Sequence, residues 1–136
     1  MVDPMLDLHS LKRPASPNHH LIAPEGFAGP QPDEPAPTFD LPAPALYALA
    51  RRVALAEPRV RLLEEAPERL TFEARQRTPV WRLADDVTIE VLPLGDSRAT
   101  LALYSRSRCG RGDFGVNRRR ARRWLEQIVE RAAVGR

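Results

Sequence analysis

Ten of the fourteen prolines lie at or before Pro44, and this uneven distribution is the strongest constraint on the fold. Proline lacks a backbone N–H and fixes φ, so the stretch RPASPNHHLIAPEGFAGPQPDEPAPTFDLPAP is predicted to be extended chain. No apolar period of about 3.6 or 2 residues survives there for more than a few positions. We therefore predict a leader over residues 1–41, either disordered or lying as a strap on a single domain over residues 42–136.

Apolar spacing beyond Pro42 predicts two helices. In PAPALYALARRVALAEP the apolar residues recur at helical spacing, which predicts a first helix at about 43–56 that ends before Pro58. A second helix is predicted near the end of the chain, with Asn117 as its N-cap and Gly135 as its stop. Its single apolar stripe consists of Ala121, Trp124, Leu125, Ile128, Val129 and Ala132.

Four runs between these helices alternate as strands do. RVRLLEEA and RLTFEAR are joined by a predicted tight hairpin at EEAPE, and DDVTIEVLP is joined to TLALYSRSR by turn residues in LGDSRA. The order helix, four meandering strands, helix predicts an α+β fold in two layers, with helices on one face of an antiparallel four-stranded meander sheet, preceded by the extended leader. In the last strand the predicted core-facing residues are Leu101, Leu103, Ser105 and Ser107, and the opposite face carries Tyr104, Arg106 and Arg108.

Positive charge is concentrated at the C-terminal end. Residues 98–136 carry eleven arginines against three carboxylates, so residues 1–97 have a net charge of −5 although the whole chain is +3. A basic C-terminal third favours an anionic partner, such as a phosphate-bearing ligand, nucleic acid, an anionic lipid surface or an acidic protein. The alternative interpretation is a solvated basic face in a chain that is rich in arginine throughout.

The residue types that several chemistries require are scarce. The single cysteine, Cys109, excludes an internal disulfide. All three histidines, His9, His19 and His20, lie in the leader, so the predicted domain offers no imidazole as a general base or zinc ligand, and we expect neither a metal nor another cofactor. No stretch approaches the roughly twenty apolar residues of a membrane span, and the first residues lack the pattern of a signal peptide.

The richest motif is YSRSRCGRGDFGVNRRRARRWLEQI. Together with WRLADDVTIEV and RPASPNHHL, it resembles the domain of unknown function 1499 family, whose members share a Ser-Arg-Ser-Arg strand end, a Gly-rich turn with Asp, and Gly-Val-Asn-Arg opening a helix. The resemblance extends from about Pro14 to Ile128. The motif residues that it marks are Ser16, Pro17, Asn18, Asp85, Asp86, Ser105, Arg106, Ser107, Arg108, Gly110, Asp113, Gly115, Asn117 and Arg118.

The resemblance also bears on location. It implies a small bacterial or plastid protein, in a family with no established activity. Similar proteins often begin with a signal peptide, a lipoprotein signal or a single membrane span, and this chain starts where such a span would have ended. The chain as written reads as soluble, and the resemblance implies a membrane or envelope association through a missing anchor.

Two interpretations of the motif are open. In the first, the turn CGRGD and the start of the last helix form an anion-binding site. Glycines there allow backbone N–H groups to converge on a phosphate or carboxylate, and Arg106, Arg108, Arg118 and Arg120 add bidentate donors.

In the second interpretation the motif is architectural. Asp86 and Asp113 pair with arginines of the last strand and hold the strand, the turn and the helix together, while Gly110 and Gly115 adopt positive φ. The Ser-Pro-Asn segment of the leader then docks on this polar site, with Asn18 satisfying its backbone groups.

The favoured function is a non-catalytic interaction or accessory protein that binds a larger assembly, membrane-associated and respiratory or photosynthetic, through its leader and its Arg-rich face. Catalysis by Asp85 and Asp86 as acid and base or as Mg²⁺ ligands is disfavoured, because adjacent strand residues point to opposite faces. Small-anion binding at the Gly-Arg turn is one alternative. Nucleic-acid binding through NRRRARR is a second, although the chain lacks the interleaved aromatic and basic residues of single-strand readers.

Overall fold

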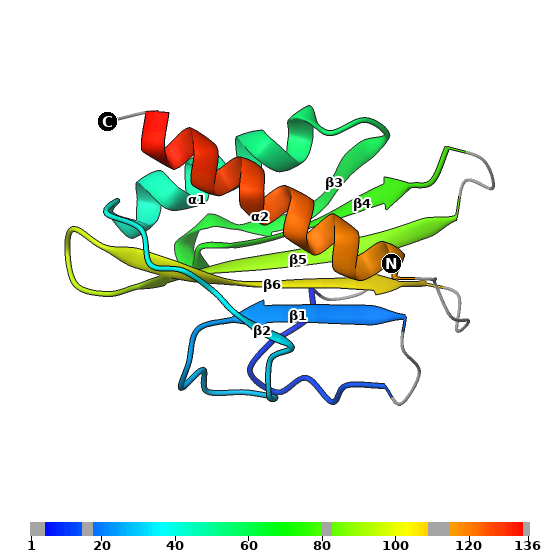
Figure 1. Cartoon of the computed structure of the whole chain (residues 1–136), viewed down its shortest axis with the longest axis horizontal. Helices are drawn as coiled ribbons and strands as arrows, with labels where there is room; N and C mark the ends of the chain where they lie inside the picture. The colour runs from blue at the N-terminus through cyan, green and yellow to red at the C-terminus, as the bar shows by residue number, and fades with distance from the viewer. Residues whose placement is uncertain (1–4, 15–17, 80–82, 109–114, 135–136) are drawn as a thin grey trace.

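The computed structural model describes residues 5–14, 18–79, 83–108 and 115–134, which form a six-stranded mixed sheet with two helices on one face (Figure 1). An α+β fold with helices on one face was predicted and is confirmed. The elements are, in chain order, β1 (His19–Ala23), β2 (Glu34–Pro35), α1 (Ala43–Ala56), β3 (Val60–Ala66), a 3₁₀ turn (Pro67–Arg69), β4 (Thr71–Arg77), β5 (Ala84–Pro93), β6 (Ala99–Ser107) and α2 (Val116–Val134).

The leader supplies two strands, which corrects the prediction of a four-stranded sheet. The strand order is β2-β1-β6-β5-β4-β3, with β1 antiparallel to β6 and parallel to β2. The predicted meander of β3 to β6 is present as expected. The run HHLIA was missed because it has only five residues and its partner β6 lies far along the chain. The division of the chain into a leader and a domain at residue 41 stays a prediction.

The first helix matches its predicted bounds, whereas the second begins differently from its prediction. Val116 is already helical, and the Arg119 N–H donates to the Gly115 carbonyl at 3.0 Å. Asn117 is therefore not the N-cap; it lies inside the helix, fully buried. The predicted apolar stripe faces the sheet except at Val129, which is 42% exposed, and Gly135 lies outside the described residues.

The main core lies between the helices and the sheet. Phe72, Ile89 and Leu103 project from β4, β5 and β6 and pack with Leu46 of α1 and Trp124 of α2, all fully buried. Burying a large apolar side chain stabilises a fold by roughly 1.5–3 kcal/mol. This core sets which face of β5 and β6 meets the helices, and so determines on which side each polar residue of the motif lies.

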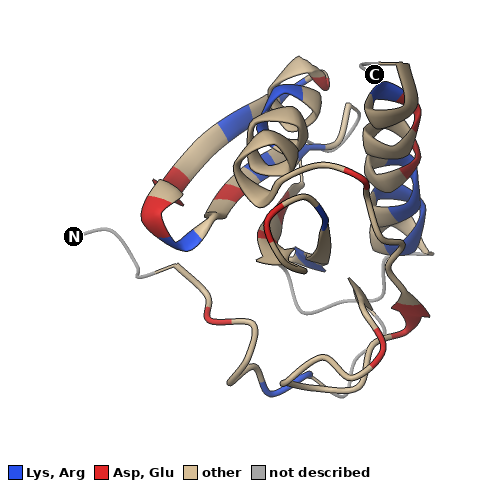
Figure 2. Cartoon of the chain, turned by 90° about the vertical axis from the view of Figure 1, so that its left-hand side faces the viewer, with Lys and Arg blue, Asp and Glu red and all other residues tan. Residues whose placement is uncertain are grey.

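A second apolar cluster lies on the opposite face, where the leader covers part of the sheet (Figure 2). Leu8 is 1% exposed and packs with Leu21 of β1 and with Ala102 and Tyr104 of β6. Next to it, His9 Nε2 lies 2.9 Å from a Glu90 carboxylate oxygen, and this hydrogen bond raises the pKa of His9 against the opposing effect of burial. Leu8 and His9 thus hold this part of the leader against the sheet.

Candidate functional site

The motif residues at the end of β6 and the start of β5 divide between the two faces of the sheet. Side chains alternate along a strand, so neighbours such as Asp85 and Asp86 point in opposite directions. The predicted faces of Ser105 and Tyr104 are confirmed, since the first contacts α2 and the second lies in the leader cluster. The set facing the helices, here the inner network, comprises Gln76, Asp85, Ser105, Ser107, Asn117 and Arg120. The set on the other face, here the outer cluster, comprises Arg75, Asp86, Arg106 and Arg108.

Asn117 is the centre of the inner network. Its side-chain oxygen accepts a hydrogen bond from Ser105 Oγ at 2.6 Å, and its Nδ2 donates to Ser107 Oγ at 2.8 Å. The same Nδ2 donates to the backbone carbonyl of Asn18 at 3.0 Å. Buried polar groups that lose a partner are costly, so one amide holds the last helix, β6 and the leader in a single arrangement.

Arg120 and Asp85 form a buried ion pair within the inner network. Their side chains are 8% and 5% exposed, and Arg120 Nη2 lies 2.9 Å from Asp85 Oδ2. The Arg120 Nε donates to Gln76 Oε1 at 2.8 Å, and Nη1 donates to Asn117 Oδ1 at 3.1 Å. Each nitrogen of this guanidinium is engaged within the protein, which is typical of a structural element that selects one packing of helix on sheet.

Asn18 of the leader reaches the polar site through its backbone. It is 4% exposed, and its carbonyl accepts from the Ser107 N–H at 3.0 Å as well as from Asn117. The leader residues Ser16 and Pro17 lie outside the described residues. The structure thus brings Asn18 to the inner network, with its carbonyl as the contacting group.

Asp86 is the centre of the outer cluster and is 1% exposed. Arg75 Nε donates to its Oδ1 at 2.8 Å, and Arg108 Nη1 lies 3.1 Å from its Oδ2, with Arg106 Nη2 at 4.0 Å. Burial raises the pKa of the Asp86 carboxyl, but hydrogen bonds from Arg75 and Arg108 outweigh it, and the pKa lies below its ordinary value of 3.8. Of the two predicted partners of Asp86, Arg108 is hydrogen-bonded to it, whereas Arg106 comes no closer than 4.0 Å.

At the start of α2 only part of the predicted site is described. Gly115 has φ of 79°, a left-handed conformation that glycine adopts without strain, as predicted. Arg118 follows on the exposed side of the helix. Gly110 and Asp113 lie outside the described residues, so the anion-binding turn and the Asp113 pairing stay predictions.

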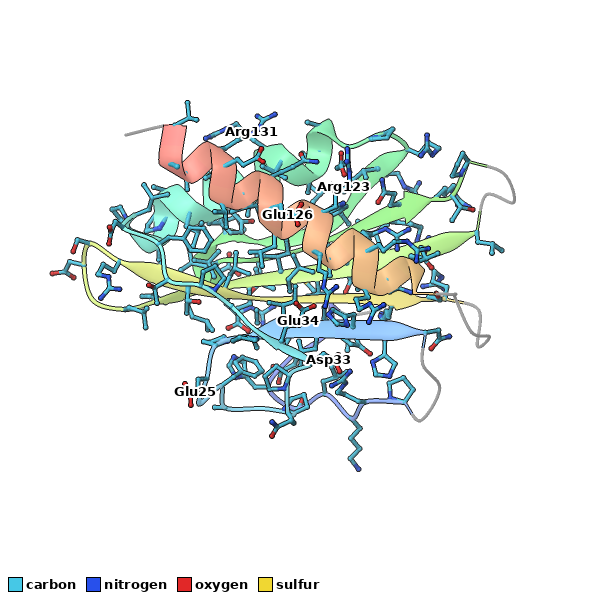
Figure 3. All side chains as sticks on the ribbon, viewed as in Figure 1. Glu25, Asp33, Glu34, Arg123, Glu126 and Arg131 are labelled. Atoms are coloured by element: carbon cyan, nitrogen blue, oxygen red, sulfur yellow. The ribbon has the colours of Figure 1, made fainter. Side chains whose placement is uncertain are left out.

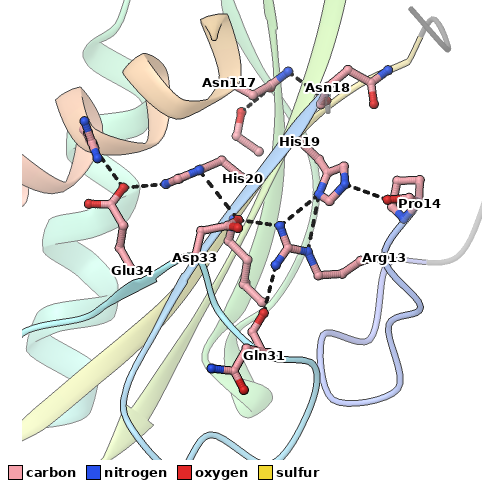
Figure 4. A network of polar contacts seen from close by, with 12 residues as sticks. Arg13, Pro14, Asn18, His19, His20, Gln31, Asp33, Glu34 and Asn117 are labelled. Carbon is pink, nitrogen blue, oxygen red and sulfur yellow. Dashed lines mark hydrogen bonds and ion pairs between the residues drawn. The ribbon is translucent and has the colours of Figure 1, made fainter. Parts of the chain in front are cut away.

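A second polar network, here the leader clasp, joins the leader to α2 (Figure 4). It runs from Arg13 through Asp33, His20 and Glu34 to Arg122. His20 Nδ1 lies 3.6 Å from Asp33 Oδ2, its Nε2 hydrogen bonds to Glu34, and Arg122 Nε donates to Glu34 Oε2 at 2.8 Å. Carboxylates alternate with nitrogen-bearing side chains along this chain of contacts, so the clasp fastens β1 and β2 to the helix layer.

The contacts of the leader clasp lower the pKa of both of its carboxylates. Burial raises the pKa of Asp33, but a backbone hydrogen bond from Leu21 at 2.8 Å and contacts with Arg13 lower it by more. Burial likewise raises the pKa of Glu34, and hydrogen bonds from Arg122 and His20 lower it below its ordinary value.

Residues 11–128 match the family model described as "Protein of unknown function (DUF1499)". This chain belongs to the DUF1499 family. The match confirms the resemblance and covers β1 to most of α2, so both polar networks lie within the region that the family model matches. No curated protein matches the chain.

Two solved structures are similar to this DUF1499 chain at low identity. A solution structure of a protein from Thermobifida fusca is 14% identical, covers 71% of this chain and 81% of its own, and has a TM-score of 0.42. The crystal structure of the Zhui aromatase/cyclase from a Streptomyces species is 22% identical, covers 73% of this chain and 84% of its own, and has a TM-score of 0.35.

Sequence reasoning missed several partners in the DUF1499 motif. Arg75 pairs with Asp86, Gln76 binds Arg120, and the carboxylates of the leader clasp lie in the segment that was predicted to be an extended leader. The alternation in RLTFEAR puts Arg75 on the face opposite Phe72. A predicted register of β4 on β5 would therefore have shown that Arg75 lies beside Asp86. Within the described ranges, no group of three or more His, Cys, Asp or Glu is placed to hold a metal ion. Neither helix in the described part of the chain is long and apolar enough to cross a membrane.

Proposed function

We propose that this DUF1499 protein is a non-catalytic interaction protein that docks on a larger assembly through the first half of α2. Four exposed arginines within six positions, here the basic patch, carry the proposal, because such a concentration of cations favours an acidic protein surface. In Figure 2 basic positions recur along this helix, and Figure 3 labels Arg123 among its side chains. The basic patch consists of Arg118, Arg119, Arg122 and Arg123.

Two carboxylates partly offset the basic patch. Arg122 pairs with Glu34 and Arg123 pairs with Glu57, each at 2.8 Å. The Arg122 side chain is 50% exposed and that of Glu34 is 28% exposed, so this surface ion pair contributes about 0–1 kcal/mol. Glu57 is only 6% exposed, so breaking its pair with Arg123 would leave a buried carboxylate unpaired. A partner that presents several carboxylates can therefore exchange the Arg122 contact for its own at small cost.

The leader extends the same surface. Glu34 of the leader clasp touches Arg122, and the neighbouring Pro35 and Pro37 are exposed. A proline-rich segment that is already extended loses little conformational entropy when a partner binds along it. Leader and basic patch together thus support the docking surface that we propose, on an assembly that we expect to be membrane-associated and respiratory or photosynthetic.

The carboxylates of the motif support the non-catalytic part of the proposal. Asp85 is paired with Arg120 on one face of the sheet, and Asp86 is paired with Arg75 on the other. Two carboxyl groups on opposite faces do not share one substrate, and each is held by a fixed cation, which suits structure better than proton transfer.

The test compares two charge-reversal variants of the tagged full chain expressed in its own host. Arg118→Glu/Arg119→Glu cancels the net positive charge of the basic patch, and Arg52→Glu/Arg131→Glu makes the same change in charge at exposed arginines outside it. Acidic residues at a helix N-terminus are favourable, so the patch variant is expected to stay folded. Complexes are isolated from mild-detergent extracts of membranes and from the soluble fraction, and identified by mass spectrometry.

We expect a stoichiometric protein partner with the original chain and the control variant, and its loss with the patch variant and at high salt. Equal retention by both variants would contradict the role of the basic patch. If nuclease removes the co-purifying material and binding falls steeply with salt, the result favours the nucleic-acid alternative. A monomer in both fractions would exclude the docking function.

A further inference from the structure

A row of basic side chains crosses the sheet face opposite the helices. The strand registers align Arg61 of β3, Arg75 of β4, Asp86 of β5, Arg106 of β6 and His19 of β1. Neighbouring strands lie about 4.8 Å apart, so these side chains are direct neighbours. One carboxylate thus stands among four basic residues.

Arg75 is the main partner of this carboxylate. Its Nε and Nη2 donate to the two oxygens of Asp86 at 2.8 and 3.4 Å, and Arg75 is only 18% exposed. A two-bond contact of this kind fixes both groups in orientation and in charge. The positive charges of Arg106 and Arg108 are consequently left in excess beside a neutral pair.

Arg106 and Arg108 both retain hydrogen-bonding capacity. Arg108 makes one contact with Asp86, at 3.1 Å, and is 46% exposed, while Arg106 is 36% exposed and comes no closer to Asp86 than 4.0 Å. Among the described residues, the buried Nε of Arg106 has no hydrogen-bond partner. A buried donor without an acceptor is uncommon in folded proteins, and an ion bound at the site is one explanation for it.

Other groups around the pair are already engaged. On the next row, the Glu73 carboxylate accepts from Thr88 Oγ1 at 2.8 Å. Beside Arg106, the His19 ring contacts the Pro14 carbonyl at 2.9 Å and Arg13 Nη2 at 3.3 Å. Neither neighbour forms a contact with Arg106 or Arg108 that would occupy their free donors.

We propose that the outer cluster binds a doubly charged tetrahedral oxyanion, a phosphate or phosphomonoester group, with Arg106 and Arg108 as its ligands. Two guanidinium forks match two charges and several acceptor oxygens, and Asp86 with Arg75 acts as the positioning pair. The site is independent of the proposed docking function, because the outer cluster and the basic patch lie on opposite sides of the sheet.

The test is calorimetric titration of the full chain with sulfate and with inorganic phosphate at constant ionic strength. Arg106→Gln and Arg108→Gln each remove one ligand, and Arg61→Gln is the matched control, since it makes the same change on the same face. We expect saturable one-site binding whose Kd rises at least tenfold in each ligand variant and less than twofold in the control. Arg106→Lys keeps the charge but lacks the fork, so it should also weaken binding while the thermal midpoint is kept.

Two further titrations distinguish the sources of the phosphate group. O-phosphoserine represents soluble phosphomonoesters, and phosphatidylcholine vesicles with and without phosphatidic acid represent lipid headgroups. If the chain binds one of these probes and Arg108→Gln abolishes that binding, the site is supported. The probe that binds then identifies the source of the phosphate group. The proposal would be overturned if no probe binds saturably. It would also be overturned if Arg61→Gln weakens binding as much as the two ligand variants do, because diffuse positive charge would then explain the binding.

Discussion

Asn117 Nδ2 donates to the backbone carbonyl of Asn18 at 3.0 Å, a hydrogen bond between residues 99 positions apart. The two segments meet because Asn117 lies within α2 and Asn18 immediately precedes β1, which pairs with β6. The motif at the start of the last helix is therefore hydrogen-bonded to the leader. The stability of the leader and the stability of the motif consequently depend on each other.

Replacing Asn117 by alanine should destabilise the whole fold. The change removes the acceptor of Ser105 Oγ, the donor to Ser107 Oγ and one of the two donors to the Asn18 carbonyl in a buried site, for a loss of about 2–4 kcal/mol in the free energy of unfolding. Urea unfolding measures it, with Arg118→Ala at the next, exposed position as the control, which should change stability by less than about 0.5 kcal/mol. Equal effects of the two substitutions on the free energy of unfolding would show that the inner network contributes little to stability.

The buried pair of Asp85 and Arg120 should show strong coupling in a double-mutant cycle. Arg120→Met leaves a buried carboxylate unpaired and should cost about 3–5 kcal/mol. Asp85→Asn/Arg120→Met removes both charges, so it should lose clearly less than the sum of the single variants, with a coupling energy of at least about 1 kcal/mol. Additive losses in thermal or urea unfolding would contradict a direct interaction.

Asp86 should make stability depend on pH in the acid range. Its folded-state pKa lies below 3.8, so its contribution is present above the unfolded pKa and is lost as pH falls through the folded one. Asp86→Asn should therefore cost about 2 kcal/mol near neutral pH, and this difference should shrink below about pH 4. If the difference in the free energy of unfolding between the two proteins stays constant from neutral to acid pH, this linkage is excluded.

Leu8 tests whether the leader is an integral part of the fold. It is 1% exposed against Leu21 and Tyr104, so Leu8→Ala should lower the free energy of unfolding by about 2–3 kcal/mol. Leu94, 44% exposed in the turn between β5 and β6, provides the same substitution as a control, with an expected change within about 0.5 kcal/mol. A leader that unfolds separately would instead give two transitions, with only the first shifted by Leu8→Ala.

Local patterns predicted much of the fold. The first helix has the predicted bounds, Leu101 and Leu103 face the helices, and Asp85 and Asp86 point to opposite faces. Each of these follows from a period of about 3.6 or 2 residues within one segment. The predicted start of the second helix was wrong, because the buried hydrogen bonds of Asn117 outweigh the preference of asparagine for an N-cap position.

The pairing of segments distant in sequence could not be predicted in this way. Alternation in RLTFEAR and DDVTIEV indicates which side chains share a face, but only the register of β4 on β5 brings Arg75 to Asp86. The same holds for β1, whose five residues carry a weak local signal and become a strand because β6 offers them an apolar partner.

The sequence by itself determined the family, the order of the helices and the meander strands, and the face on which the motif residues of β5 and β6 lie, because these depend on local spacing. The tertiary structure alone decided that the leader completes the sheet and that the arginines divide into a buried inner network and a partly exposed outer cluster. Those outcomes depend on desolvation and on contacts between segments up to 99 residues apart, and no periodicity along the chain encodes them.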